Sequence, residues 1–254
     1  MDLKDILLFG AGLAVGSMNA IAGGGMLMGF PVLLATGLPA LIANGTGNVV
    51  IFPGQLASAV GYWKYLRKTP WKYAWLLAPW AVGAVIGALL LRRTPSMTFE
   101  RYVPGLILFA VLLFAFQPFL HHYLHKHLKS RSKRVKPLVI IGIALFPVAI
   151  YGGYFGAGVG FIMLAFLGFT KLHDAHQINA MKNVAATVSA AICMVILSHG
   201  HFINWHAGLV MAAGSTIGGY AGARYAQSIS SHAIRVVVIA IGIVTVTYLG
   251  FRSY

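Results

Sequence analysis

Amide and ammonium side chains stand inside two segments that are otherwise apolar. Asn44 and Asn48 are four residues apart, as are Asn179 and Asn183, so each pair occupies one face of a helix. Lys182 lies beside the second pair, about two turns into its predicted helix, where burying a charge is costly. Amide NH₂ groups and an ammonium group donate hydrogen bonds. Together they predict a binding site for a small oxyanion.

Glycine-rich stretches precede both pairs of asparagines. Residues 19–31 read NAIAGGGMLMGFP, and residues 152–161 read GGYFGAGVGF. Each glycine costs a helix interior about 1 kcal/mol relative to alanine, so both stretches predict breaks in otherwise helical segments. The short apolar helix that follows each break would present free backbone N–H groups and the positive end of a helix dipole.

The candidate substrate-binding residues combine these breaks with the polar helix faces that follow them. They are Gly23, Gly24, Gly25, Asn44, Thr46, Asn48, Gly156, Gly158, Gly160, Asn179, Lys182 and Asn183. Each feature also has a purely structural explanation. Small residues and asparagines are common where membrane helices pack, and a lysine near an interface can extend its ammonium group to water. The recurrence of the pattern in both halves of the chain favours a shared site.

Acidic groups and catalytic motifs are scarce in this sequence. The chain has four acidic residues, Asp2, Asp5, Glu100 and Asp174, all near the ends of apolar segments. A cation site would need such carboxylate ligands inside a segment. Metalloprotease, nucleophile-elbow and phosphate-loop motifs are absent, and a single cysteine, Cys193, excludes a cysteine-cluster metal site. We therefore expect no enzyme activity, no catalytic residues, no metal and no cofactor.

The composition is that of a protein dissolved in lipid. Of the 254 residues, 59% are hydrophobic and 9% are charged, whereas soluble domains carry about 25% charged residues. Most of the apolar segments are near the roughly 20 residues that cross a hydrocarbon core. These segments cover residues 6–36, 40–63, 73–91, 102–120, 138–169, 178–197, 207–227 and 236–250. We predict an all-α polytopic membrane protein with about eight transmembrane helices.

The net charge of +15 is concentrated in short connections between these segments. Residues 64–72 carry four lysines and arginines, and residues 126–136 carry six. The positive-inside rule places both connections in the cytoplasm, facing anionic lipid headgroups, so we expect membrane lipid and not nucleic acid as the partner of this charge. The N-terminus is on the same side if the first long segment crosses the membrane once.

The two halves of the chain resemble each other at a constant offset. Asn179 and Asn183 stand 135 residues after Asn44 and Asn48, and Gly160 stands 135 residues after Gly25. This indicates a tandem duplication, with a first repeat over 1–120, a basic connecting loop over 121–137 and a second repeat over 138–254. Four crossings per half, which we favour, would make the repeats parallel. A hairpin at each glycine break would invert the second half.

The chain resembles the sulfite exporter TauE/SafE family over nearly its whole length. The resemblance lies in AGGGMLMGFPVLL followed by GLPALIANGTGNVV, and in the weaker copy GAGVGFIMLAFLGF followed by HDAHQINAMKNVAAT. It implies a multi-pass permease of the inner membrane that moves sulfite, sulfonates or related anions, commonly outward. The second copy departs from the pattern, with Ala157 and Val159 interrupting the glycines, so the first half-site is expected to dominate.

The predicted function is a carrier for a small sulfur-containing oxyanion, working by alternating access of the two repeats. The substrate would lie between the glycine breaks, held by backbone N–H groups, asparagine amides and Lys182. A homodimer is compatible with this arrangement. Two alternatives remain open: an anion channel using the same donors, and a membrane-embedded sulfur-relay protein using Cys193.

Overall fold

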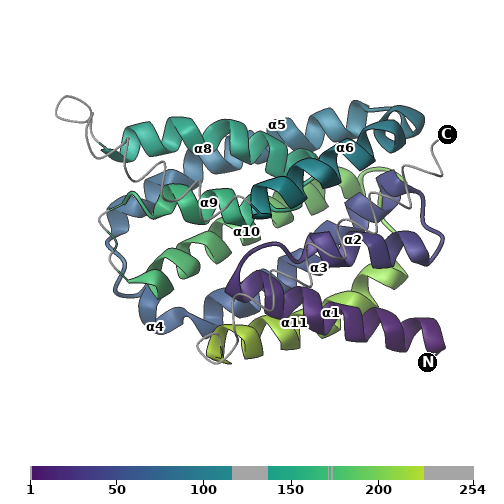
Figure 1. Cartoon of the computed structure of the whole chain (residues 1–254), viewed down its shortest axis with the longest axis horizontal. Helices are drawn as coiled ribbons and strands as arrows, with labels where there is room; N and C mark the ends of the chain where they lie inside the picture. The colour runs from purple at the N-terminus through teal and green to yellow at the C-terminus, as the bar shows by residue number, and fades with distance from the viewer. Residues whose placement is uncertain (1, 116–136, 171, 173, 226–254) are drawn as a thin grey trace.

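The computed structural model describes residues 2–115, 137–170, 172 and 174–225, and within these ranges the only regular structure is helical. The predicted basic connection over 121–136 and the last apolar segment, 236–250, lie outside the described residues. The elements, shown in Figure 1, are α1 (Leu3–Ile21), α2 (Met26–Ala35), α3 (Ala40–Gly61), α4 (Trp63–Leu66), the 3₁₀ helix η1 (Trp71–Leu76), α5 (Leu77–Arg93), α6 (Ser96–Ala115), α8 (Pro137–Tyr154), α9 (Val159–Leu167), α10 (Ala175–Ser198) and α11 (Trp205–Tyr225).

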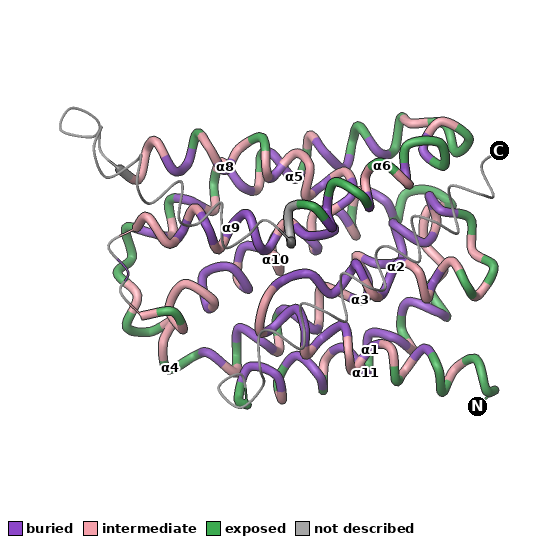
Figure 2. Tube along the Cα trace, viewed as in Figure 1, coloured by how far each residue is buried: buried purple, intermediate pink, exposed green. Residues whose placement is uncertain are grey.

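Both glycine-rich stretches break the helix, as the sequence predicts. The chain leaves α1 at Ile21 and enters α2 at Met26, and it leaves α8 at Tyr154 and enters α9 at Val159. Gly23 has φ +92°, and Gly156 and Gly158 have φ +77° and +76°. Side chains rarely tolerate this left-handed conformation, so glycine is required at these three positions. Most residues of both breaks are buried, as the purple and pink stretches in Figure 2 show.

Glycines allow two pairs of helices to pack backbone against backbone. A Cβ on Gly214 or Gly218 of α11 would lie 2.1 Å from the carbonyl oxygen of Phe9 or Leu13 in α1. Because the residue numbers rise together, α1 and α11 are parallel. In the same way Gly87 of α5 approaches Ile150 of α8.

The helices α1 and α8 run in opposite directions. α3 is parallel to α11, and therefore to α1, because Gly54 and Gly61 of α3 approach Ser215 and Ala223 of α11 in order. Asn44, near the start of α3, donates a hydrogen bond to the carbonyl of Tyr154 at the end of α8. α8 therefore ends where α3 begins, as Figure 1 also shows.

The expected parallel relation of the two halves is therefore wrong for their first helices. The chain turns back at the glycines, and α2 leads toward the end of the bundle where α1 begins (Figure 1). The apolar length of the first segment fits a broken crossing and a hairpin equally well, and the left-handed Gly23 produces the hairpin. The N-terminus consequently lies at the opposite end of the bundle from α4 (Figure 1).

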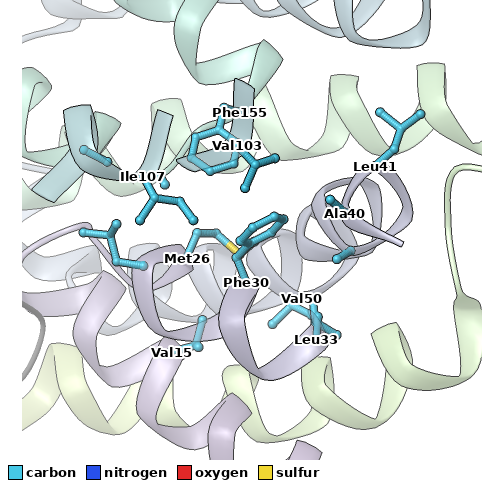
Figure 3. Close-up of a cluster of buried hydrophobic side chains, with 14 of the residues drawn as sticks. Val15, Met26, Phe30, Leu33, Ala40, Leu41, Val50, Val103, Ile107 and Phe155 are labelled. Carbon is cyan, nitrogen blue, oxygen red and sulfur yellow. The ribbon is translucent and has the colours of Figure 1, made fainter. Parts of the chain in front are cut away.

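A hydrophobic core holds α2 in place after it turns back. Phe30 of α2 packs edge-on against Phe155, with ring centroids 5.4 Å apart, and both are buried. Val103 and Ile107 of α6 and Val50 of α3 complete this cluster around Phe30 (Figure 3). The break at Gly23 is thus fixed by packing on its far side as well as by backbone conformation.

Replacing Gly160 with alanine is expected to destabilise the protein. A Cβ on Gly160 would lie 2.6 Å from the carbonyl oxygen of Gly23, and relieving such a clash costs about 1–3 kcal/mol. Thermal denaturation of the detergent-solubilised protein measures the loss. The matched control is Gly10→Ala, where a Cβ meets nothing within 4 Å and the midpoint should hold or rise. Equal midpoints for the two variants would contradict the contact between the breaks.

Candidate functional site

A cavity lies where the two glycine breaks meet. A Cβ on Gly23 would lie 2.8 Å from the Cα of Gly160, so the two breaks touch backbone to backbone. Side chains from both halves of the chain surround this contact. The lining residues are Asn19, Gly23, Met26, Asn44, Asn48, Ile51, Gln55, Trp80, Gly152, Phe155, Gly156, Val159, Gly160, Met163, Lys182, Ala186, Ser189 and Ala190.

The cavity is small. The centres of water molecules can reach about 40 Å³ of it. One water needs about 10–15 Å³ by this measure, so the cavity has room for roughly three waters. An ion of four or five heavy atoms occupies a comparable space, whereas a larger solute requires the helices to separate.

Lys182 is the charged residue of the cavity wall. Its side chain is 1% exposed, and its Nζ donates a hydrogen bond of 2.5 Å to the backbone oxygen of Asn19. That carbonyl belongs to the last turn of α1, where carbonyl groups lack a partner within the helix. A cation at this helix end is also favoured by the helix dipole.

None of the four acidic residues of the chain reaches Lys182. Asp2 and Glu100 are exposed, Asp5 pairs with His206 at 3.0 Å, and Asp174 caps the start of α10. The ammonium group of Lys182 therefore faces a carbonyl and a cavity, and no side-chain carboxylate. A buried charge in this setting attracts an anion into the cavity.

Asn19 connects three elements of the site. Its carbonyl accepts from Lys182 of α10, and its side-chain Oδ1 accepts a hydrogen bond of 2.8 Å from the backbone N–H of Gly25. Asn19 was not among the sequence-predicted site residues. It was nevertheless visible as a polar residue at the end of an apolar segment, directly before the glycines.

The first pair of predicted asparagines lines the cavity. The Nδ2 of Asn44 donates to the carbonyl of Tyr154 at 2.9 Å, and the Nδ2 of Asn48 donates to the carbonyl of Asn44 at 3.2 Å. Each amide NH₂ carries two hydrogens, so one donor of each group remains for a ligand. Gln55 continues the same helix face and also lines the cavity.

Two buried groups of the cavity wall have no hydrogen-bond partner. They are the Nε1–H of Trp80, which is 1% exposed, and the Oε1 of Gln55, which is 3% exposed. Buried polar atoms are normally paired, so these two indicate that the cavity receives a ligand or water. The sequence signals Gln55 by its spacing from Asn48, whereas nothing in the sequence marks Trp80.

Backbone donors also face the cavity. Met26 and Gly160 lie in the first turns of α2 and α9, and both line the cavity. Within the described part of the chain, the N–H groups of these two residues have no backbone acceptor. The first N–H groups of a helix bind anions well because they are unpaired and lie at the positive end of its dipole.

Several predicted site residues lie elsewhere. Gly24 packs under the ring of Phe161, Gly158 precedes α9, and the Oγ1 of Thr46 accepts from the backbone N–H of Asn204 at 2.9 Å. Neither these residues nor Gly25, Asn179 and Asn183 line the cavity, whereas Gly23, Gly156 and Gly160 do.

Asn183 is fully buried, and neither polar atom of its side chain has a partner. Asn179 likewise has an unpartnered Oδ1. The helix α10 turns Lys182, Ala186 and Ser189 toward the cavity instead of these two asparagines.

Metal and thiol chemistry have little support in the described residues. No group of three or more histidine, cysteine or acidic side chains gathers there. Cys193 is buried, with its Sγ 3.7 Å from the carbonyl of Gly153, and does not line the cavity.

Comparison with known proteins places the chain among membrane transporters of one family. The family model described as sulfite exporter TauE/SafE matches residues 8–249. A probable membrane transporter protein of Haemophilus influenzae is 31% identical, over 92% of this chain and 89% of its own length. Probable membrane transporter protein YfcA of Escherichia coli K12 is 27% identical, over 99% of this chain and 91% of its own length. No solved structure matches. The chain therefore belongs to the sulfite exporter TauE/SafE family.

Proposed function

We propose that this protein is a multi-pass inner-membrane carrier that exports a small sulfur-containing oxyanion, such as sulfite or an organosulfonate, by alternating access. The observation that carries the proposal is Lys182, a buried cation without a carboxylate partner, at a cavity between two broken helices. The family and the names of the relatives support transport as the activity.

The outer surface fits a membrane environment. Among the described helices, Leu3–Ile21, Trp71–Arg93 and Ala175–Ser198 are long and apolar enough to span a bilayer. Trp63, Trp71 and Trp75 are exposed beside the basic residues of positions 64–72, a combination typical of the cytoplasmic interface. α8 begins at the same end of the bundle as α4 (Figure 1). In this orientation the N-terminus faces the periplasm.

The two halves form inverted repeats in this proposal. α8, α9, α10 and α11 begin within a few residues of the positions that lie 135 after the equivalent starts in the first half, or within about two turns for α11. The partners are exchanged: α1 of the first half packs on α11, and α8 of the second half packs on α5.

Two hydrogen bonds between the halves follow the same rule. Asn44 of the first half donates to the carbonyl of Tyr154, and Lys182 of the second half donates to the carbonyl of Asn19. Tyr154 stands 135 residues after Asn19, so both bonds end at equivalent positions of the broken helices. Inverted repeats around a central site are a common plan of carriers.

Transport follows from motion of one half against the other. The oxyanion accepts hydrogen bonds from the ammonium of Lys182, the N–H of Gly160 and the Nε1–H of Trp80. Because the cavity is small, release requires the contact between Gly23 and Gly160 to shift. The bonds at Asn19 and Tyr154 join the halves near this contact, so they are the natural points for such a movement.

Replacing Lys182 with methionine is expected to weaken sulfite binding by about tenfold or more, because the buried counter-charge of the anion is lost. Isothermal titration calorimetry on purified protein in detergent gives the affinity. The control is the same change at Lys68, which is exposed near α4 and should leave binding unchanged. Wild-type affinity in the Lys182 variant would remove this residue from the site.

Replacing Asn19 with aspartate tests the electrostatics of the site with an isosteric change. The carboxylate still accepts from the N–H of Gly25 but places a negative charge near Lys182, so anion binding should fall by about tenfold or more while the fold is kept. Calorimetry and a melting curve separate the two effects. Asn204→Asp is the control, since the Oδ1 of Asn204 likewise accepts a backbone N–H, from Ala207. Undiminished binding in Asn19→Asp would contradict an anion at this position.

Replacing Trp80 with phenylalanine removes the unpartnered Nε1–H and keeps most of the buried ring. A hydrogen bond to an anion contributes about 1.5–3 kcal/mol, so the dissociation constant for sulfite should rise by about tenfold or more. Trp75→Phe, at a half-exposed tryptophan outside the cavity, serves as the control. If both variants bind sulfite like the wild type, the indole does not contact the substrate.

A further inference from the structure

We infer that the cavity selects a monoanion and rejects a dianion of the same shape. This inference rests on the proposed function, because it assumes that the cavity binds the transported oxyanion. It specifies the charge state of the substrate: a tetrahedral or pyramidal sulfur oxyanion with one negative charge, such as hydrogensulfite or a sulfonate.

The charge of the cavity wall carries the first part of the argument. The lining residues come from α1, α2, α3, α5, α8, α9, α10 and the two breaks. Lys182 is the one residue among them with an ionisable side chain, and every other lining side chain is neutral or apolar. One negative charge on the ligand therefore balances the site, and a second has no partner.

The surroundings of Lys182 reduce its positive charge further. Its ammonium group already donates to the Asn19 carbonyl at the C-terminal end of α1, which carries the negative end of a helix dipole. Less than a full positive charge is then available to a ligand. An unpaired second charge in a buried, membrane-embedded cavity is strongly unfavourable.

The neutral part of the wall also fits a ligand with one uncharged substituent. The Oε1 of Gln55 is a buried acceptor without a partner, and all oxygens of a dianion are acceptors too. A hydroxyl on the ligand would donate to this oxygen, whereas a deprotonated oxygen would be repelled. Met26, Ile51 and Met163 provide apolar wall against which a methyl group packs.

The charge requirement has a consequence for sulfite. Sulfite and hydrogensulfite exchange a proton near neutral pH, and only the protonated form matches the cavity. The carrier would thus move the anion together with its proton, as one hydrogensulfite ion. No separate proton-binding carboxylate is required, which agrees with the absence of acidic residues from the lining.

Three ligands of nearly constant shape test the inference on the wild-type full-length protein. Methanesulfonamide, methanesulfonate and sulfate each have a tetrahedral sulfur and carry charges of zero, one and two. Calorimetry in detergent near neutral pH should show saturable binding of methanesulfonate, at least about tenfold weaker binding of sulfate, and no binding of methanesulfonamide.

Each other outcome has a defined meaning. Sulfate binding as tight as methanesulfonate, or methanesulfonamide binding equally well, overturns the charge selection and leaves the oxyanion site standing. Absence of binding for all three, and for sulfite, overturns the proposed function and this inference with it.

A charge-gain variant tests the same point in the opposite direction. Gln55→Lys adds a second cation to the wall and removes the unpartnered acceptor. The ratio of methanesulfonate affinity to sulfate affinity should fall by about tenfold or more in this variant. A ratio equal to that of the wild type in folded Gln55→Lys protein overturns the inference.

Discussion

The backbone contact between Gly23 and Gly160 is the constraint on which the rest of the structure depends. Two helices that stop inside the bundle must have their ends paired or exposed to a polar cavity, because unpaired backbone groups are costly in lipid. Glycine allows the two breaks to touch, and the ends of four half-helices then surround one small space. Asn19 binds an N–H of one end and accepts from Lys182 of the other half, so the same residues that close the break also build the site.

The exchange of helices between the halves explains how such a site is kept rigid and yet able to move. Long glycine-lined contacts join α1 to α11 and α5 to α8, which gives two firm groups of helices. Between these groups, the described polar links at the cavity are those of Asn44 and Lys182 to backbone carbonyls. A carrier needs this combination: stiff units, and a thin polar boundary that a substrate can open.

Local rules predicted the parts of the site that depend on local sequence. The breaks followed from glycine propensity, and the shared face of Asn44 and Asn48 followed from helical spacing. The direction of the second half did not follow, since a hairpin and a broken crossing have the same apolar length. Rotation of α10 about its axis decides that Lys182 and not Asn183 faces the cavity, and Trp80 arrives from a distant helix. Such features depend on tertiary packing that no local pattern encodes.

Counterflow of radiolabelled sulfite in proteoliposomes tests the central claim most directly. Vesicles loaded with unlabelled sulfite should take up the label transiently above its equilibrium level, because a carrier whose site alternates exchanges inner for outer substrate. Vesicles containing the Lys182→Met variant should show no such overshoot. Uptake that only equilibrates, with or without Lys182, would contradict an alternating anion site between the two breaks.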